Sequence, residues 1–353
     1  MTAKVAIVSL RFNPAFVQHS VAYAKAVSEL GYDVGFVLNR AYRRFSDFER
    51  VAPIFDPADA SPAPRWTHAA FMNPSTENSA MATKLKKGGT KILYVYHEPW
   101  QMSPQYLTAE GLPGTLRAIL AHRSSISNLK IADTVILASQ YGLSEYRKSD
   151  DRFNKNSVYI PLLFDDEATE DLAAMVRQKC CFGYIGNLCR SHGFDQFVSF
   201  MKRALQRDKD VRFLVASRVS FPARLLRDPI LSKNLDRIEI RCGQPLGNDE
   251  INQCYVQSLC VWNIYRRSTQ SGVLPKAFMF GTPVIASKVG SFSEWVRTDV
   301  NGRFAEADDF EGILAAFEEI RNNISSYASG SRQTFLETFF YRSNLAAIRR
   351  ILE

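Results

Sequence analysis

Two neighbouring arginines come just before a polar turn and an apolar segment in the second half of the chain. Arg266 and Arg267 follow an apolar run, and Gln270, Ser271 and Gly272 come directly before the next one. Such residues start a helix, and the first amides of a helix, like guanidinium groups, favour negative charge. The segment indicates a diphosphate site, although a well-capped buried helix with surface arginines would show the same pattern.

A second turn of this kind contains a glycine and two basic side chains. A short apolar run ends at Gly186, and Arg190 and His192 come just before Gly193, where a helical pattern starts. Free amides at a helix N-terminus beside such side chains favour a phosphate. Any strand-to-helix turn of an α/β fold can look similar, so the spacing alone leaves both interpretations open.

These turns belong to a chain in which short apolar strands alternate with amphipathic helical segments. Residues 5–10 and 34–38 are predicted strands, and residues 15–30 between them are a predicted helix that ends at Gly31. Further strands are predicted at 92–96, 134–138, 158–162, 182–185, 213–216, 238–241, 261–265 and 283–287. Further helices are predicted at 115–128, 140–148, 194–205, 249–258, 273–280, 292–297, 310–321 and, at the C-terminus, 335–348. Strands that are apolar throughout indicate parallel sheets covered by helices on both faces.

A polar segment after residue 163 separates two such series. We therefore predict an α/β chain of two doubly wound Rossmann-like domains that face one another across a cleft. The first domain is expected to span residues 1–165 and the second residues 166–330, with residues 331–353 forming a C-terminal helix that packs back on the N-terminal domain. Ligands of such sheets bind at the carboxyl ends of the strands. Residues 40–75, rich in Arg, Asp and Pro, give no clear pattern.

Composition excludes several classes of protein. The 353 residues are 46% hydrophobic and 23% charged, as in globular domains rather than disordered chains. No apolar run approaches the roughly 18–20 residues of a transmembrane helix, and no signal peptide is evident, so we expect a cytoplasmic protein. No G-x-G-x-x-G follows an opening strand, which argues against a nicotinamide cofactor. The six cysteines form no C-x-x-C pair, so neither a disulfide framework nor a metal site is predicted.

The positive charge is concentrated in the first half of the chain. The net charge is +8, and residues 1–160 hold 19 Lys and Arg against 13 Asp and Glu. This excess suits an anionic membrane surface or an acidic acceptor, and a solvated basic face without a partner fits it equally well. We expect no nucleic-acid partner, because no helix shows a concentrated basic face.

Three motifs in the second half carry a resemblance to a known family. Residues 281–287 (GTPVIAS), then 289–294 (VGSFSE) and then 301–302 (NG), resemble the C-terminal signature of GT-B glycosyltransferases of the family-4 type. The resemblance covers residues 186–304, and the order of elements over the whole chain agrees with it. It implies a retaining, metal-independent transferase that uses a nucleotide-sugar donor as substrate and needs no cofactor.

The resemblance also implies roles for particular residues. Gly186 would lie in the turn that approaches the donor diphosphate, and residues 270–272 would lie beside the donor sugar and phosphate. Glu294 matches the acidic residue after the usual glycine pair. His97, at the end of a strand in residues 96–100 (YHEPW), matches a histidine that faces the donor sugar, and we predict it as the catalytic residue. Without the resemblance, a helix-capping or core histidine would be the better interpretation.

Two further residues are expected on the acceptor side. Asn13 and His19 lie near the first strand-to-helix turn, where the family usually has a glycine pair that this chain lacks.

The chain departs from the family at the donor site. Ser268 and Lys276 occupy the positions of two usual glutamates, Asn187 stands where arginine is common, and His192 stands where lysine is common. We expect compensation by positive charge from three arginines: Arg190, Arg266 and Arg267. Lys276 is expected to face a donor phosphate, or a carboxylate on the donor sugar.

These features favour a cytoplasmic glycosyltransferase, peripheral on the inner face of the membrane, that extends a polysaccharide or a lipid-linked glycan. Cations and helix amides stabilise a leaving diphosphate without metal, and the resemblance implies front-face attack by the acceptor. Membrane contact is suggested by the basic first half and by the apolar and aromatic residues 100–107. The alternative is a catalytically degenerate GT-B scaffold that serves as a binding or regulatory partner in glycan assembly. A third possibility is a sugar-nucleotide epimerase, which would need catalytic carboxylates that we could not place.

Overall fold

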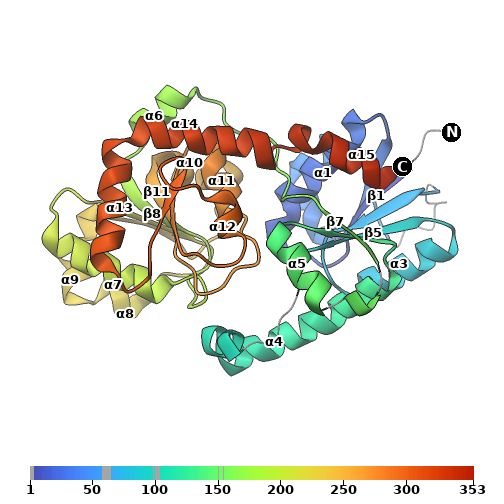
Figure 1. Ribbon diagram of the computed structural model, residues 1–353, viewed down its shortest axis with the longest axis horizontal. Helices are drawn as coiled ribbons and strands as arrows, with labels where there is room; N and C mark the ends of the chain where they lie inside the picture. The colour runs from blue at the N-terminus through green and yellow to red at the C-terminus, as the bar shows by residue number, and fades with distance from the viewer. Residues whose placement is uncertain (1–3, 58–64, 98, 100–103, 150, 154) are drawn as a thin grey trace. The chain divides into compact units, whose positions relative to one another are not determined.

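The chain forms two compact α/β units. The computed structural model describes residues 4–57, 65–97, 99, 104–149, 151–153 and 155–353. The first unit consists of residues 1–165 together with 338–353, and the second consists of residues 166–337. Within each unit, the strands pair in parallel into one sheet that helices cover on both faces (Figure 1). The predicted pair of doubly wound Rossmann-like domains is confirmed.

The first unit is built on a seven-stranded sheet with the order β3-β2-β1-β4-β5-β6-β7. Its strands are β1 (Lys4–Ser9), β2 (Asp33–Leu38), β3 (Ile54–Phe55), β4 (His68–Phe71), β5 (Lys91–Tyr96), β6 (Thr134–Leu137) and β7 (Asn156–Tyr159). Because the strands are parallel, their carboxyl ends lie at one edge of the sheet.

Most helices of this unit connect these strands, and η6 and α15 come from the C-terminal end of the chain. The main ones are α1 (Val17–Glu29), α3 (Thr76–Lys87), α4 (Pro104–Ile131), α5 (Gln140–Ser149) and α15 (Leu345–Leu352). Short ones are α2 (Ser46–Glu49) and the 3₁₀ segments η1 (Pro14–Phe16), η2 (Arg40–Arg44), η3 (Asp151–Phe153) and η6 (Tyr341–Asn344). Ser75 caps α3 by accepting a hydrogen bond from the amide of Asn78, and Gly31 ends α1 with a φ of 85°.

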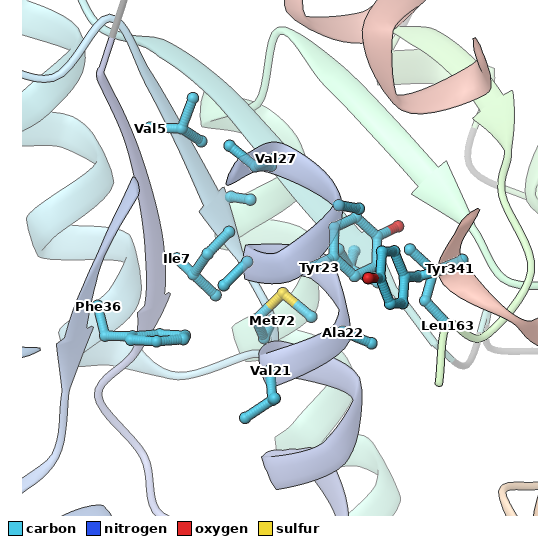
Figure 2. Packing of buried hydrophobic residues seen from close by; sticks show 14 of the residues in the cluster. Val5, Ile7, Val21, Ala22, Tyr23, Val27, Phe36, Met72, Leu163 and Tyr341 are labelled. Carbon is cyan, nitrogen blue, oxygen red and sulfur yellow. The ribbon is translucent and has the colours of Figure 1, made fainter. Parts of the chain in front are cut away.

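The core of this unit lies on both faces of the sheet because side chains alternate along each strand. Val5 and Ile7 of β1 pack with α1 and α15, whereas Ala6 and Val8 pack in a separate cluster on the other face. Figure 2 shows the first cluster, in which Tyr23 of α1 lies near Tyr341.

The second unit is built on a six-stranded sheet with the order β10-β9-β8-β11-β12-β13. Its strands are β8 (Cys181–Ile185), β9 (Phe213–Ser217), β10 (Ile238–Cys242), β11 (Ser258–Asn263), β12 (Val284–Ala286) and β13 (Gly302–Phe304). Its helices are α6 (Leu172–Gln178), α7 (Phe194–Arg207), α8 (Ala223–Leu226), α9 (Pro229–Ser232), α10 (Asn248–Gln257), α11 (Val273–Met279), α12 (Phe292–Trp295), α13 (Phe310–Asn322) and α14 (Ile324–Thr334). The central strands β8 and β11 are buried along their whole length.

The C-terminal segment differs from the single helix predicted at 335–348. The chain forms a π-helical turn (η5, Phe335–Phe339) and then η6 before α15 begins. The break has a tertiary cause, because the amide of Phe164 donates to the carbonyl of Phe339 and the amide of Tyr341 donates to the carbonyl of Phe164. The change of unit falls at residue 338 rather than at the predicted 331, since α14 packs against α6 and α11 in the second unit.

No helix in the described part of the chain is both long enough and apolar enough to cross a bilayer.

Candidate donor and hydroxyl sites

The turn after β8 lies beside the start of α11. Gly186, directly after β8, has a φ of 134°, a conformation that side chains rarely allow. A methyl group there would lie 3.7 Å from Cγ2 of Val273, the first residue of α11. Two segments that the sequence assigned to a donor phosphate therefore meet at the carboxyl edge of this sheet.

The same turn closes tightly against the end of β11. Gly193 has a φ of 69°, and its amide donates to the carbonyl of Arg190 at 3.0 Å. A methyl group at Gly193 would overlap the carbonyl oxygen of Ile264. Gly193 has no side chain to cap α7, but the amide of Phe194 donates to the carbonyl of Cys189 at 3.2 Å. The amides of Asp195 and Gln196 hydrogen-bond the Asp195 carboxylate.

Arg266 holds this turn in place. Its amide donates to the carbonyl of Ser191 at 2.9 Å, and its guanidinium donates to both carboxylate oxygens of Asp195, at 2.6 and 2.9 Å. Burial raises the pKa of Asp195, but the hydrogen bonds and charge of Arg266 outweigh burial and bring the pKa below its usual value. Arg266 thus has an internal anionic partner before any ligand binds.

The other basic residues of the turn differ in exposure. The ring of His192 stacks on that of Tyr265, with centroids 4.3 Å apart and planes 3° apart. Arg190 and Asn187 are exposed. The side chain of Arg190 is therefore open to an anionic ligand, whereas His192 is fixed by its stacking partner.

The loops after β11 and β12 touch one another. Gly290 has a φ of 53°, and a methyl group there would overlap the carbonyl oxygen of Ser268. The Ser268 hydroxyl donates to the carbonyl of Gln270 at 3.0 Å, and Ser271 Oγ accepts the amide of Val273 at 3.3 Å. These contacts order the backbone before α11. Ser268 contributes a hydroxyl there, at a position where the family usually has a glutamate.

Glu294 is half-buried on α12, in the segment that follows β12. The predicted donor residues all lie on the segments that follow β8, β11 and β12: Gly186, Asn187, Arg190, His192, Arg266, Arg267, Gln270, Ser271, Gly272 and Glu294.

Lys276 has an internal role instead of the expected contact with a donor phosphate. It is 7% exposed, and its ammonium donates to the carboxylate of Glu167 at 2.6 Å and to the amide oxygen of Asn252 at 2.6 Å. The amide groups of Asn248 and Asn252 donate to the same carboxylate. This network ties α11 to α10 and to the segment before α6, so these contacts do not support the expected role toward the donor.

In the first unit, His97 is buried directly after β5. Its Nε2 lies 3.0 Å from the carbonyl oxygen of Met72, and its ring lies 4.6 Å from that of Phe16. Burial, followed by the charge of His19, lowers the pKa of His97 to about 3, although the bond to Met72 opposes the shift. A base this weak is poorly suited to accept a proton at neutral pH, which leaves hydrogen bonding as its available chemistry.

Asn13 and His19 lie on the segment that precedes and begins α1. The Asn13 side chain accepts the amide of Ala15 at 3.1 Å and so caps η1. His19 is buried, and burial lowers its pKa to about 4 despite a hydrogen bond with the backbone of Leu163. The rings of His19 and His97 are 5.3 Å apart, so the structure brings these two predicted residues together.

A polar network that the sequence did not reveal holds the first turn. Asn73 donates to the carbonyl of Arg11 at 2.7 Å, Asn78 accepts the amide of Leu10 at 2.9 Å, and Ser9 Oγ lies 2.9 Å from Tyr42 Oη. These side chains order a turn that lacks the usual glycine pair. Their partners are distant in sequence, so no local pattern signals them.

Asn263, the last residue of β11, was also missed. It is fully buried, and neither polar atom of its amide has a partner among the described residues. A single asparagine at the end of an apolar strand is the one signal that the sequence offers. Within the described ranges, no group of three or more His, Cys, Asp or Glu side chains is placed to hold a metal ion.

Comparison with known proteins tests the family resemblance. Residues 179–323, all in the second unit, match the family model described as Glycosyl transferases group 1. A search of curated proteins gave no significant match. The resemblance seen in the sequence motifs is confirmed over the matched residues.

Solved structures with GT-B architecture align with nearly the whole chain at low sequence identity. Sucrose-phosphate synthase from Thermosynechococcus elongatus aligns with a TM-score of 0.72 and 14% identity over 99% of this chain and 98% of that chain. HepE from Anabaena in complex with UDP-glucose gives 0.70 and 13% over 99% of each. The catalytic domain of starch synthase IV from Arabidopsis thaliana, bound to ADP and acarbose, gives 0.66 and 11% over 99% and 98%. At these identities the similarity defines the fold, which is GT-B.

Proposed function

We propose that the chain is a glycosyltransferase that moves a sugar from a nucleotide-sugar donor to a polysaccharide or lipid-linked glycan. The observation that carries this proposal is the convergence of three loops, after β8, β11 and β12, within the segment that matches the family model. Proteins of the same fold have been solved with UDP-glucose and with ADP, which supports a nucleotide-sugar donor.

The charges at these loops suggest how the reaction would proceed. A leaving diphosphate gains negative charge, and fixed donors lower the free energy of that charge most when they are already in place. The exposed guanidinium of Arg190 provides such a donor. Because this group needs no metal, we propose a metal-independent reaction. Retention of configuration follows from the family resemblance.

Contact with an anionic membrane is part of this proposal. On α4, Leu112, Leu116 and Leu120 are 83%, 60% and 55% exposed. At 3.6 residues per turn, exposed Arg123 and Lys130 lie on the same face as these leucines. A stripe of this kind inserts apolar side chains between lipids while basic side chains contact anionic head groups.

A catalytically degenerate scaffold is the second candidate. The observation that favours it is the ion pair between Lys276 and Glu167, because it buries a cation where the family usually has a glutamate. Such a protein would still bind a nucleotide sugar if the three loops are intact, but it would not turn it over.

Calorimetric titration with nucleoside diphosphates and nucleotide sugars, without added metal, tests the proposal. We expect one nucleotide sugar to bind selectively, and Arg190→Ala to weaken its binding about tenfold through loss of a charge-assisted contact. Arg224→Ala, which removes an exposed arginine from α8, is the matched control and should leave the affinity unchanged. Absence of binding across the panel would reject the proposed donor site. Binding with no sugar transfer to any glycan or lipid-linked acceptor would favour the degenerate scaffold.

A further inference from the structure

Two adjacent cysteines at the start of β8 bring their sulfur atoms into contact. Sγ of Cys180 lies 3.3 Å from Sγ of Cys181. Both residues carry free thiols. Successive side chains of an extended strand point to opposite faces, so this contact shows that the chain departs from an extended conformation just before β8, which begins at Cys181.

The backbone on both sides of this contact is held by β11 and by the residue before it. The amide of Cys180 donates to the carbonyl of Gln257 at 2.9 Å, and Cys181 pairs with Ser258, the first residue of β11. The ladder is irregular directly beyond this pair, because Phe182 pairs with Cys260. Such irregularities change the direction in which nearby side chains point. The two thiols are therefore positioned by the sheet.

The two thiols differ in their access to solvent. Cys180 is exposed, whereas Cys181 is 5% exposed. Burial raises the pKa of Cys181, so its thiol keeps its proton near neutral pH. An oxidant that arrives from solvent meets Cys180 first, and the sulfur of Cys181 lies beside it. Redox-sensing cysteines show this arrangement of an accessible thiol next to a resolving one.

We propose that Cys180 and Cys181 form a reversible disulfide with one another when the protein meets a peroxide. Hydrogen peroxide first oxidises the Cys180 thiol to a sulfenic acid and is itself reduced to one water. The sulfur of Cys181 then attacks the sulfur of Cys180, so that the S–S bond forms and the S–O bond breaks. The departing hydroxyl leaves as a second water with the thiol proton of Cys181. A small dithiol reverses the change and is oxidised to its own disulfide.

The bond between adjacent cysteines differs from an ordinary disulfide in two ways. Adjacent Cα atoms are about 3.8 Å apart, less than the roughly 4.4–6.8 Å that disulfides usually span. A bond strained in this way is reduced easily. No residue separates the two cysteines, so the bond also lacks the stabilisation that grows with the length of the closed loop. We therefore expect oxidation to lower stability and to be readily reversed.

Lys179, the residue before the pair, links this strain to the rest of the second unit. Its ammonium donates to the carbonyl of Ser258 at 3.3 Å and to Thr282 Oγ1 at 2.6 Å. These contacts join the start of β11 to the segment before β12. Closing the ring moves the backbone beside Lys179, so the oxidised protein should unfold at a lower temperature than the reduced protein.

Thiol counting on the full-length chain tests the proposal. In denaturant, the reduced protein should show six thiols, and brief treatment with hydrogen peroxide should lower the count to four. The mass of the protein should fall by two hydrogen atoms, and dithiothreitol should restore both values. Mass spectrometry of a digest should place the new bond within the one peptide that contains both cysteines.

Two variants separate this pair from the other cysteines. Cys180→Ser removes the exposed sulfur, so its five thiols and its unfolding temperature should not change with peroxide. Cys242→Ser is the matched control, because Cys242 is also partly exposed and its sulfur lies 3.4 Å from the carbonyl oxygen of Val215, a contact that a serine hydroxyl keeps. This control should fall from five thiols to three and should show the same decrease in unfolding temperature as the wild type.

Several results would overturn the proposal. One is a wild-type protein that keeps all its thiols after peroxide treatment. Another is a disulfide from Cys180 to a second copy of the chain, visible as a dimer on a non-reducing gel. A third is a sulfinic acid at Cys180 beside an unreacted Cys181. An unfolding temperature that stays the same after the bond has formed would reject the link through Lys179. None of these measurements uses a nucleotide or a sugar, so they test the proposal independently of the proposed function.

Discussion

At the scale of single residues, a glycine can be required by its contacts as well as by its backbone conformation. Gly193 and Gly243 both have positive φ, at 69° and 97°. A methyl group at Gly193 overlaps the backbone of Ile264, whereas at Gly243 the nearest atom is the flexible hydroxyl of Ser220, 3.2 Å away. Only the first substitution must move the end of β11.

We predict that Gly193→Ala destabilises the second unit more than Gly243→Ala does. Both variants carry the strain of a side chain at positive φ, about 1–2 kcal/mol, and Gly193→Ala adds an overpacking penalty of about 1–3 kcal/mol. Denaturant unfolding measures the difference, and calorimetry should show loss of nucleotide binding in Gly193→Ala alone. Equal destabilisation by the two substitutions would show that the contact with Ile264 carries no energetic weight.

At the scale of elements, the membrane contact proposed for the exposed face of α4 can be tested by itself. We predict that replacing Leu112, Leu116 and Leu120 with glutamine abolishes binding to anionic vesicles, because each exposed leucine that enters the bilayer contributes apolar burial. Co-sedimentation with vesicles of mixed neutral and anionic lipids measures it, and wild-type binding should weaken as salt rises. Glutamine at Leu226 and Leu235, which are exposed at 40% and 44%, is the control and should bind like wild type. Retained binding of the α4 variant would reject this surface.

A buried lysine joins three elements of the second unit. The ammonium of Lys179 donates to the carbonyls of Val256, Ser258 and Phe280 at 3.2–3.4 Å and to Thr282 Oγ1 at 2.6 Å. These carbonyls lie at the end of α10, at the start of β11 and just after α11. Burial makes the charged ammonium costly despite these acceptors, so the stability of this unit should depend on the protonation state of Lys179.

Burial lowers the pKa of Lys179 from 10.5 to about 7. Between these values the unfolded chain keeps a proton that the folded chain has lost, so the free energy of unfolding should rise with pH. We predict that the free energy of unfolding of the wild type, minus that of Lys179→Met, increases from pH 7 to pH 9. The increase should be at most about 1.4 kcal/mol per pH unit. Denaturant unfolding at several pH values checks this, with Lys209→Met as an exposed control. A difference that stays constant or falls with pH would contradict the assignment.

The sequence predicted the elements where local pattern and tertiary contacts agree. The apolar runs of β1, β5, β8 and β11 were located correctly to within a few residues. The strand β4 was missed because its sequence, HAAF, is short and includes histidine and two alanines, although it is buried in the middle of the sheet. The C-terminal segment was predicted as one helix because its periodicity does not reveal the backbone pairing with Phe164.

In the candidate site, too, local motifs reveal some residues and only tertiary contacts reveal others. The glycine turn and the segment around Gln270 could be located from motifs, because their spacing along the chain is fixed. The partners of Arg266 and Lys276 could not, since Asp195 and Glu167 lie 71 and 109 residues away. Charge counting alone therefore overstated the number of cations available to a ligand.

At the scale of the whole molecule, the chain forms two compact units, and the proposed nucleoside diphosphate is assigned to loops of the second unit alone. A ligand that binds only folded protein stabilises the part that holds it, by about 2.7 kcal/mol at a hundred times its Kd. A nucleotide should therefore stabilise the second unit and leave the first unit unchanged.

We predict that UDP or ADP slows amide hydrogen exchange in residues 186–193 and 287–294 while exchange in α1 and β5 stays unchanged. Hydrogen exchange resolved by mass spectrometry measures both regions in one sample. Arg190→Ala is the matched control, because it should remove the nucleotide effect at a concentration that saturates the wild type. Protection by the nucleotide in α1 rather than in the loops of the second unit would contradict the assignment of the nucleotide to the second unit.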